Sequence, residues 1–249
     1  MTPWDALAIA AAGLGAGAVN AVVGSGTLIT FPTLIALGYA PVLANVSNTV
    51  GLVPGSATAA IAYRRELAGQ RARLRVLCTC STIGALIGAT LLLTLPKGAF
   101  KAIVPVLIVL ALALVIVQPR FSAAVAARGE RPHHGGTGLA CGVLATGIYG
   151  GYFGAAQGVL LMGLLGTLLA EDMQVLNGIK NVLAMTANLV AAVVFISVEH
   201  IDWKAAGLIA GGSILGGLIG ARLARRLPPG ALRVVIVCVG TVAIVRLLT

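Results

Sequence analysis

The chain has 249 residues, of which 59% are hydrophobic and only 10% charged, and its formal net charge is +10. Soluble globular domains carry about 25% charged residues, so this composition excludes an ordinary soluble domain. Continuous apolar runs of about twenty residues predict membrane-spanning helices and exclude a β-barrel, whose strands alternate over about ten residues. We attribute the positive charge to the positive-inside rule and expect no nucleic-acid partner.

The first half of the chain contains four apolar segments. The first segment, at residues 5–37, is too long for one span and too short for two, and its central glycines disfavour a continuous helix. We therefore expect a break at 20–27. Three ordinary segments follow at 42–63, 74–95 and 100–117. The polar stretch at 118–136 is interpreted as a cytoplasmic linker.

The second half repeats this order. A long, glycine-rich segment at 138–170 is expected to break at 153–158, and three more segments follow at 173–198, 203–227 and 231–248. The predicted domains are a first membrane repeat at 1–117, the linker at 118–136 and a second membrane repeat at 137–249. The fold class is all-α, a polytopic helical membrane protein.

A sequence match supports the repeat. The residues Ser81, Gly84 and Gly88 recur as Ser213, Gly216 and Gly220, at a constant offset of 132 residues, and both copies lead to a Leu-Pro pair. Glycines four residues apart share one helix face and permit close helix packing. We expect this packing role for both glycine pairs.

The arginines predict how the two halves are oriented. They precede the 74–95 segment at 64–75, whereas in the second half they follow the 203–227 segment at 222–233. Because arginine and lysine favour the cytoplasmic side, the halves are expected to have inverted topology, as in many secondary transporters. Inversion requires the two broken segments to cross an even number of times, as re-entrant hairpins or pairs of short helices.

Polar residues inside apolar segments are costly and indicate function. They gather at the two breaks and at the start of the segment after each break. The candidate substrate-binding residues are Asn20, Gly24, Ser25, Gly26, Thr27, Asn45, Asn48, Thr49, Gln157, Asn177, Lys180 and Asn181. Helix N-termini at the breaks would add free N–H donors and positive potential, which suit a small oxoanion or carboxylate.

Lys180 is the most informative single residue. It lies eight residues after Asp172, about 12 Å into its helix, and no acidic residue occupies a deep position in any apolar segment. One interpretation is a lysine that extends to the membrane interface. The other is a cation that binds an anionic substrate.

Two motifs resemble one known family. The run from Asn20 to Pro32, with Gly24-Ser-Gly26, is followed by Ala44-Asn45-Val-Ser-Asn48, and Gly150–Gly158 is followed by Asn177-Gly-Ile-Lys180-Asn181. Together they resemble the paired signatures of the sulfite exporter TauE/SafE family over almost the whole chain. The resemblance implies a membrane permease for sulfite, sulfoacetate or other sulfur-containing organic anions.

We therefore predict a secondary transporter that exports a small sulfur-containing anion, in the cell inner (plasma) membrane. The alternatives are a permease or channel for another small anion or a cation, and a non-transporting membrane assembly factor. No catalytic or metal-ligand set lies in the apolar segments, so we expect no enzyme activity, cofactor or metal. The sequence leaves open the substrate, the direction of transport, the coupling ion and whether the protein forms a homodimer.

Overall fold

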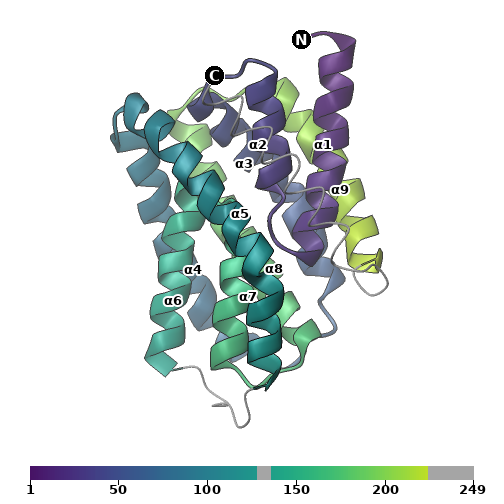
Figure 1. Ribbon diagram of the computed structural model, residues 1–249, viewed down its shortest axis with the longest axis vertical. Helices are drawn as coiled ribbons and strands as arrows, with labels where there is room; N and C mark the ends of the chain where they lie inside the picture. Colours follow the sequence, from purple (N-terminus) through teal and green to yellow (C-terminus); the bar gives the residue numbers. More distant parts are fainter. Residues whose placement is uncertain (128–135, 224–249) are drawn as a thin grey trace.

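The computed structural model describes residues 1–127 and 136–223 (Figure 1). Every regular element in these residues is an α-helix, which confirms the all-α class. The helices are α1 (Pro3–Val22), α2 (Thr27–Ala36), α3 (Pro41–Ala62), α4 (Arg71–Thr94), α5 (Lys97–Ala127), α6 (Gly136–Tyr152), α7 (Gln157–Leu168), α8 (Met173–Val198) and α9 (Trp203–Leu223).

Five described helices are long and apolar enough to cross a membrane, as a multi-pass membrane protein requires: α1, α4, α5, α8 and α9. Helix α3 has 22 residues, which is also a sufficient length. It is less apolar because it contains several polar residues, and these are buried against other helices. They include Asn45, Ser47, Asn48 and Ser56.

Both long glycine-rich segments are broken, as the sequence predicted. Helix α1 ends at Val22 and α2 begins at Thr27, whereas α6 ends at Tyr152 and α7 begins at Gln157. Helices α2 and α7 have only 10 and 12 residues. Figure 1 shows that α2 turns back toward the end of the molecule where α1 begins.

Helices of one half pack along helices of the other. Helix α1 lies along α9, and α4 lies along α6. Glycines allow these close contacts: Gly84 and Gly88 meet the backbone of α6, and Gly216 and Gly220 meet that of α1. The packing role predicted for these four glycines is confirmed.

Helices α3 and α8 occupy equivalent places in the two halves and run in opposite directions. The start of α8 contacts the end of α3, where Asn177 donates a 2.7 Å hydrogen bond to the Tyr63 hydroxyl. By contrast, α1 and α9 run in the same direction, since Gly13 meets Ile209 and Gly17 meets Ser213. The two halves are thus interleaved rather than side by side.

Two regions predicted from the sequence are only partly covered by the described residues. Helix α5 continues to Ala127, into the expected linker; the alanines at 123–127 are good helix formers. The segment expected at 231–248 and most of the arginine-rich stretch at 222–233 lie outside the described residues.

Candidate functional site

The two breaks face each other in the interior. The backbone N–H of Gly158, in the first turn of α7, donates a 2.9 Å hydrogen bond to the carbonyl of Gly24. A Cβ atom on either glycine would overlap the Cα of the other, so only glycine permits this approach. The rings of Phe31 and Phe153 pack edge to face, with centroids 5.2 Å apart. The two broken segments therefore contact each other directly.

The long helices α1 and α6 end in the same way. The N–H of Gly24 donates to the carbonyl of Val19, and the N–H of Gly154 donates to that of Tyr149, each at 3.0 Å. Both glycines have positive φ, 82° and 73°, the left-handed conformation that commonly terminates helices. The two pairs are offset by 130 residues, so the break is itself a repeated feature.

A polar side chain bridges each break, but from opposite sides. In the first half, the Asn20 side-chain oxygen on α1 accepts a 3.1 Å bond from the N–H of Gly26. In the second half, the Gln157 amide on α7 donates a 3.2 Å bond to the carbonyl of Thr146 on α6. Gly150 stands where α1 has Asn20, and a Cβ there would overlap the Gln157 amide. The two halves therefore bridge their breaks with different side chains.

Three side chains of α8 surround the end of α1. The carbonyl of Ala21 accepts from the amide groups of Asn177 (3.5 Å) and Asn181 (3.4 Å) and from the Lys180 Nζ (3.5 Å), which also donates to the carbonyl of Val22 (3.3 Å). The last carbonyls of a helix lack partners within it and carry partial negative charge. Lys180 is completely buried, and the end of α1 is its electrostatic partner.

The first half has a related contact. Asn45, which is equivalent to Asn177, donates a 3.1 Å bond to the carbonyl of Tyr152, at the end of α6. Asn48 occupies the position of Lys180 and bonds instead to two threonines of α2. Its amide donates to Thr27 at 3.5 Å, and its oxygen accepts from the hydroxyl of Thr30. Only the second half therefore carries a cation at this position.

Sequence reasoning missed a residue between the two halves. The Ser56 hydroxyl accepts hydrogen bonds from the amides of Asn20 (3.4 Å) and Asn188 (3.3 Å). Ser56 and Asn188 are related by the same 132-residue offset as the glycine motifs. That offset was the available signal, because it pairs a small polar residue in one half with an asparagine in the other.

Four buried polar atoms around the breaks have no hydrogen-bond partner among the described residues: the Ser25 hydroxyl, the Tyr152 hydroxyl and the side-chain oxygens of Asn45 and Asn177. Ser25 is only 1% exposed and lies inside the first break. Asn45 and Asn177 are at equivalent positions. Buried polar groups in proteins are normally hydrogen-bonded, so these atoms hold unused capacity for a polar ligand.

The structure brings most of the predicted site residues to the breaks and to the ends of α1 and α6. The Thr49 hydroxyl donates to the carbonyl of Asn45 within its own helix at 2.9 Å, so this bond does not connect it to either break. An ammonium and two hydroxyl groups can donate to an oxoanion, and the two amide oxygens can accept from an O–H or N–H group. Among the described residues, no three His, Cys, Asp or Glu side chains gather as a metal site would require.

Comparison with known proteins gives consistent matches. The family model described as sulfite exporter TauE/SafE matches residues 9–247. A "probable membrane transporter protein" of Haemophilus influenzae is 26% identical over 85% of this chain and 82% of its own length. The "probable membrane transporter protein YfcA" of Escherichia coli K12 is 25% identical over 94% of this chain and 86% of its own. A "probable membrane transporter protein ORF9" of a Sinorhizobium species is 27% identical over 94% and 88%. No solved structure matches the chain significantly.

Proposed function

This chain belongs to the sulfite exporter TauE/SafE family of membrane transporters, and we propose that it is a secondary transporter that exports a small sulfur-containing anion. Sulfite or an organosulfonate is the substrate class, and the inner (plasma) membrane is the location. The names of the family and of its relatives indicate a transporter rather than an enzyme.

The observation that carries this proposal is the complete burial of the Lys180 side chain. Among the described residues, no carboxylate lies within ion-pair distance of Lys180 to neutralise it. Two backbone carbonyls do so in part, at 3.3 and 3.5 Å. Charge-assisted N–H···O bonds are normally about 2.7–2.9 Å long. An oxoanion could therefore compete for this ammonium, because it offers a full negative charge at a shorter distance.

The surroundings supply further donors. The Ser25 hydroxyl is buried without a partner among the described residues and lies three positions after Val22, whose carbonyl accepts from Lys180. Helices α2 and α7 begin at the breaks, and the N-termini of helices favour anions. We therefore place the substrate beside the first break, in contact with Lys180 and Ser25.

The test is a calorimetric titration of the purified protein with sulfite, sulfoacetate, taurine, sulfate and acetate. We expect one of the sulfur-containing anions to bind best. We expect Lys180→Met, which keeps much of the side-chain volume but removes the charge, to weaken its binding by about 10–100-fold, the value of a hydrogen bond to a charged group. Lys180→Arg should also bind poorly, because a planar guanidinium does not fit the position of an ammonium.

The matched control is Arg71→Ala, since Arg71 is an exposed cation in the first turn of α4. It should bind like the unmodified protein. Size-exclusion and thermal unfolding show whether each variant is folded. Folded Lys180→Met with affinity within twofold of the unmodified protein would reject Lys180 as the substrate's counter-charge.

One observation favours a second function, a cation permease. The side-chain oxygens of Asn45 and Asn177, which accept no hydrogen bond from the described residues, could hold a cation as well as a donor group of the substrate. A buried lysine would then act as an electrostatic barrier, so Lys180→Met should increase cation flux into liposomes. The anion proposal predicts the opposite, a loss of anion flux with cation flux unchanged.

A further inference from the structure

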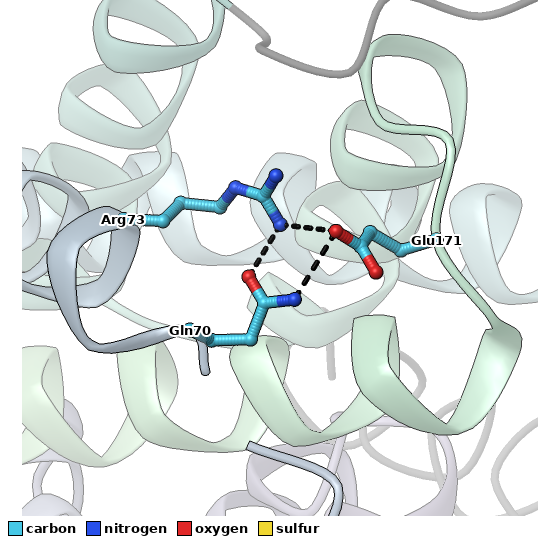
Figure 2. Close-up of polar contacts among 3 residues, drawn as sticks. All are labelled: Gln70, Arg73 and Glu171. Carbon is cyan, nitrogen blue, oxygen red and sulfur yellow. Dashed lines mark hydrogen bonds and ion pairs between the residues drawn. The ribbon is translucent and has the colours of Figure 1, made fainter. Parts of the chain in front are cut away.

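Two groups of polar residues connect the halves outside the candidate site. The first, the Arg73 cluster, consists of Gln70, Arg73 and Glu171 (Figure 2). Arg73 forms a 2.6 Å ion pair with Glu171, and the Gln70 amide donates to the same carboxylate oxygen at 3.1 Å. Arg73 also donates to the Gln70 carbonyl oxygen. The cluster joins the start of α4 to the loop between α7 and α8.

The second group, the Tyr39 pair, consists of Tyr39 and Asp202. The Tyr39 hydroxyl donates a 3.0 Å hydrogen bond to the Asp202 carboxylate. The other oxygen of Asp202 accepts from the backbone N–H groups of Lys204 and Ala205, each at 3.0 Å. The pair joins the loop between α2 and α3 to the start of α9.

These groups occupy equivalent positions in the repeat. Adding the 132-residue offset to Tyr39 gives Glu171, and adding it to Gln70 gives Asp202. In each group, the residue that precedes a helix of one half bonds to the loop after the short helix of the other half. The position is therefore repeated although the chemistry differs, an ion pair in one group and a phenol–carboxylate bond in the other.

The groups lie at opposite ends of the molecule. Helix α3 begins two residues after Tyr39, and its Ser47 hydroxyl accepts a 3.0 Å bond from the N–H of Asp202. Its 22 residues span about 33 Å. At its other end, Tyr63 contacts Asn177, four residues into α8 and close to Glu171 in the chain. The candidate site at the two breaks lies between the groups.

We propose that the Arg73 cluster and the Tyr39 pair are the two gates of the transport cycle, which open alternately to let the substrate reach the breaks from one side at a time. This inference rests on the proposed transport function. Both gates are closed in the structure, which is the arrangement of an occluded conformation.

The energetics suit contacts that open and close. The Arg73 and Glu171 side chains are 18% and 24% exposed, and ion pairs that solvent reaches contribute little net stability. Such a contact can hold one conformation without trapping it. An open pocket of about 510 Å³ borders the cluster between α4 and α6, lined by Gln70, Arg73 and Leu139 among others.

The protonation states of the Tyr39 pair are also suitable. Burial, followed by the bond to Asp202, raises the pKa of Tyr39 to about 12. Burial alone would raise the pKa of Asp202, but the N–H of Ala205, the Tyr39 hydroxyl and Lys204 outweigh it and lower that pKa. Tyr39 therefore remains a neutral donor and Asp202 a charged acceptor at physiological pH.

The experiment measures which side of the membrane reaches the first break. Ser25→Cys is the reporter, with the native cysteines replaced by alanine, and membrane-impermeant maleimide is added to right-side-out or inside-out vesicles. Glu171→Gln removes one charge of the Arg73 cluster, and Tyr39→Phe removes one hydroxyl of the Tyr39 pair. Arg71→Ala, an exposed arginine in the first turn of α4, is the matched control.

We expect Glu171→Gln to speed labelling from the side of the Arg73 cluster and to slow it from the other side. Tyr39→Phe should do the reverse. For each variant, the ratio of the labelling rates from the two sides should change by about fivefold, as loss of one hydrogen bond would shift a two-state equilibrium. Arg71→Ala should leave labelling unchanged. Changes in the same direction for both variants, or none, would overturn the proposal.

Hydrogen exchange in chains with native cysteines provides a second test if the alanine background does not fold. Glu171→Gln should increase exchange at 65–73 and 169–176 and decrease it at 38–47 and 199–206. Increased exchange at both ends would indicate contacts that only stabilise the fold. Neither assay includes a substrate, so its outcome is independent of whether Lys180 binds sulfite.

Discussion

At the scale of single residues, small differences between the two halves determine the chemistry of the site. Asn45 and Asn177 are equivalent and both bond near the end of a long helix of the other half. Asn48 and Lys180 are equivalent but differ in charge. A single substitution between repeats therefore converts a neutral hydrogen-bonding position into a cationic one without changing its location.

Gly24 permits a direct test of the contact between the breaks. Its φ of 82° costs a non-glycine residue about 1–2 kcal/mol, and a Cβ would also overlap the Cα of Gly158. Forced steric overlap of this kind costs about 1–3 kcal/mol more. We therefore expect Gly24→Ala to lower the free energy of unfolding substantially, as measured by denaturant unfolding in detergent micelles.

Gly38→Ala is the matched control, since Gly38 has a similar φ of 87° but nothing within 4 Å of the added Cβ. Its free energy of unfolding should fall only by the cost of the positive φ. Equal losses for the two variants would mean that the break-to-break contact contributes nothing to stability.

At the scale of helices, glycines determine which pairs can pack closely. Helix α4 meets α6 through Gly84 and Gly88, and α9 meets α1 through Gly216 and Gly220. Dispersion and close backbone approach drive helix association in lipid, because the hydrophobic effect between apolar helices is absent there. The pairing of helices across the two halves therefore depends on these small residues.

We expect Gly88→Ala to destabilise the fold by about 1–3 kcal/mol through overlap with the carbonyl of Ile148. This cost should exceed the gain of about 1 kcal/mol in helix propensity. Gly211→Ala on α9 meets nothing within 4 Å, so it should be neutral or slightly stabilising. Thermal unfolding of both variants measures the difference, and comparable melting temperatures would contradict the packing role of Gly88.

At the scale of the whole molecule, each half contacts the broken segment of the other half. The end of α1 lies against α8, the end of α6 lies against α3, and the breaks meet at Gly24 and Gly158. A relative motion of the halves would therefore change the surroundings of both breaks at once. This coupling is what a transporter with one central site requires.

The predicted orientation is tested by labelling from outside the cell. Ala68 and His200 are exposed and lie in the loops after α3 and α8, two helices that run in opposite directions. The positive-inside rule places Ala68, beside the arginines at 64–75, in the cytoplasm. An impermeant maleimide should label His200→Cys in intact cells and Ala68→Cys only after permeabilisation. Reversed labelling would reject the orientation, and labelling of both from outside would reject the inverted halves.

The sequence alone determined the class of the protein and the places where its helices break. Both are local properties: an apolar composition needs a bilayer, and glycines such as Gly24 and Gly154 end a helix wherever it packs. The paired motifs also carried the family resemblance, because they are contiguous in the chain. The equivalence of Tyr39 with Glu171 was present in the same 132-residue offset, but the sequence pattern did not indicate that either residue had a partner.

Only the tertiary structure decided which residues meet. Lys180 and the carbonyl of Ala21 are 159 residues apart, and no sequence pattern predicts that a lysine of α8 will partner the end of α1. Tyr39 and Asp202 are 163 residues apart. Hydrogen bonds at such separations depend on how the helices pack, and in this molecule that packing is set by close glycine contacts between the two halves.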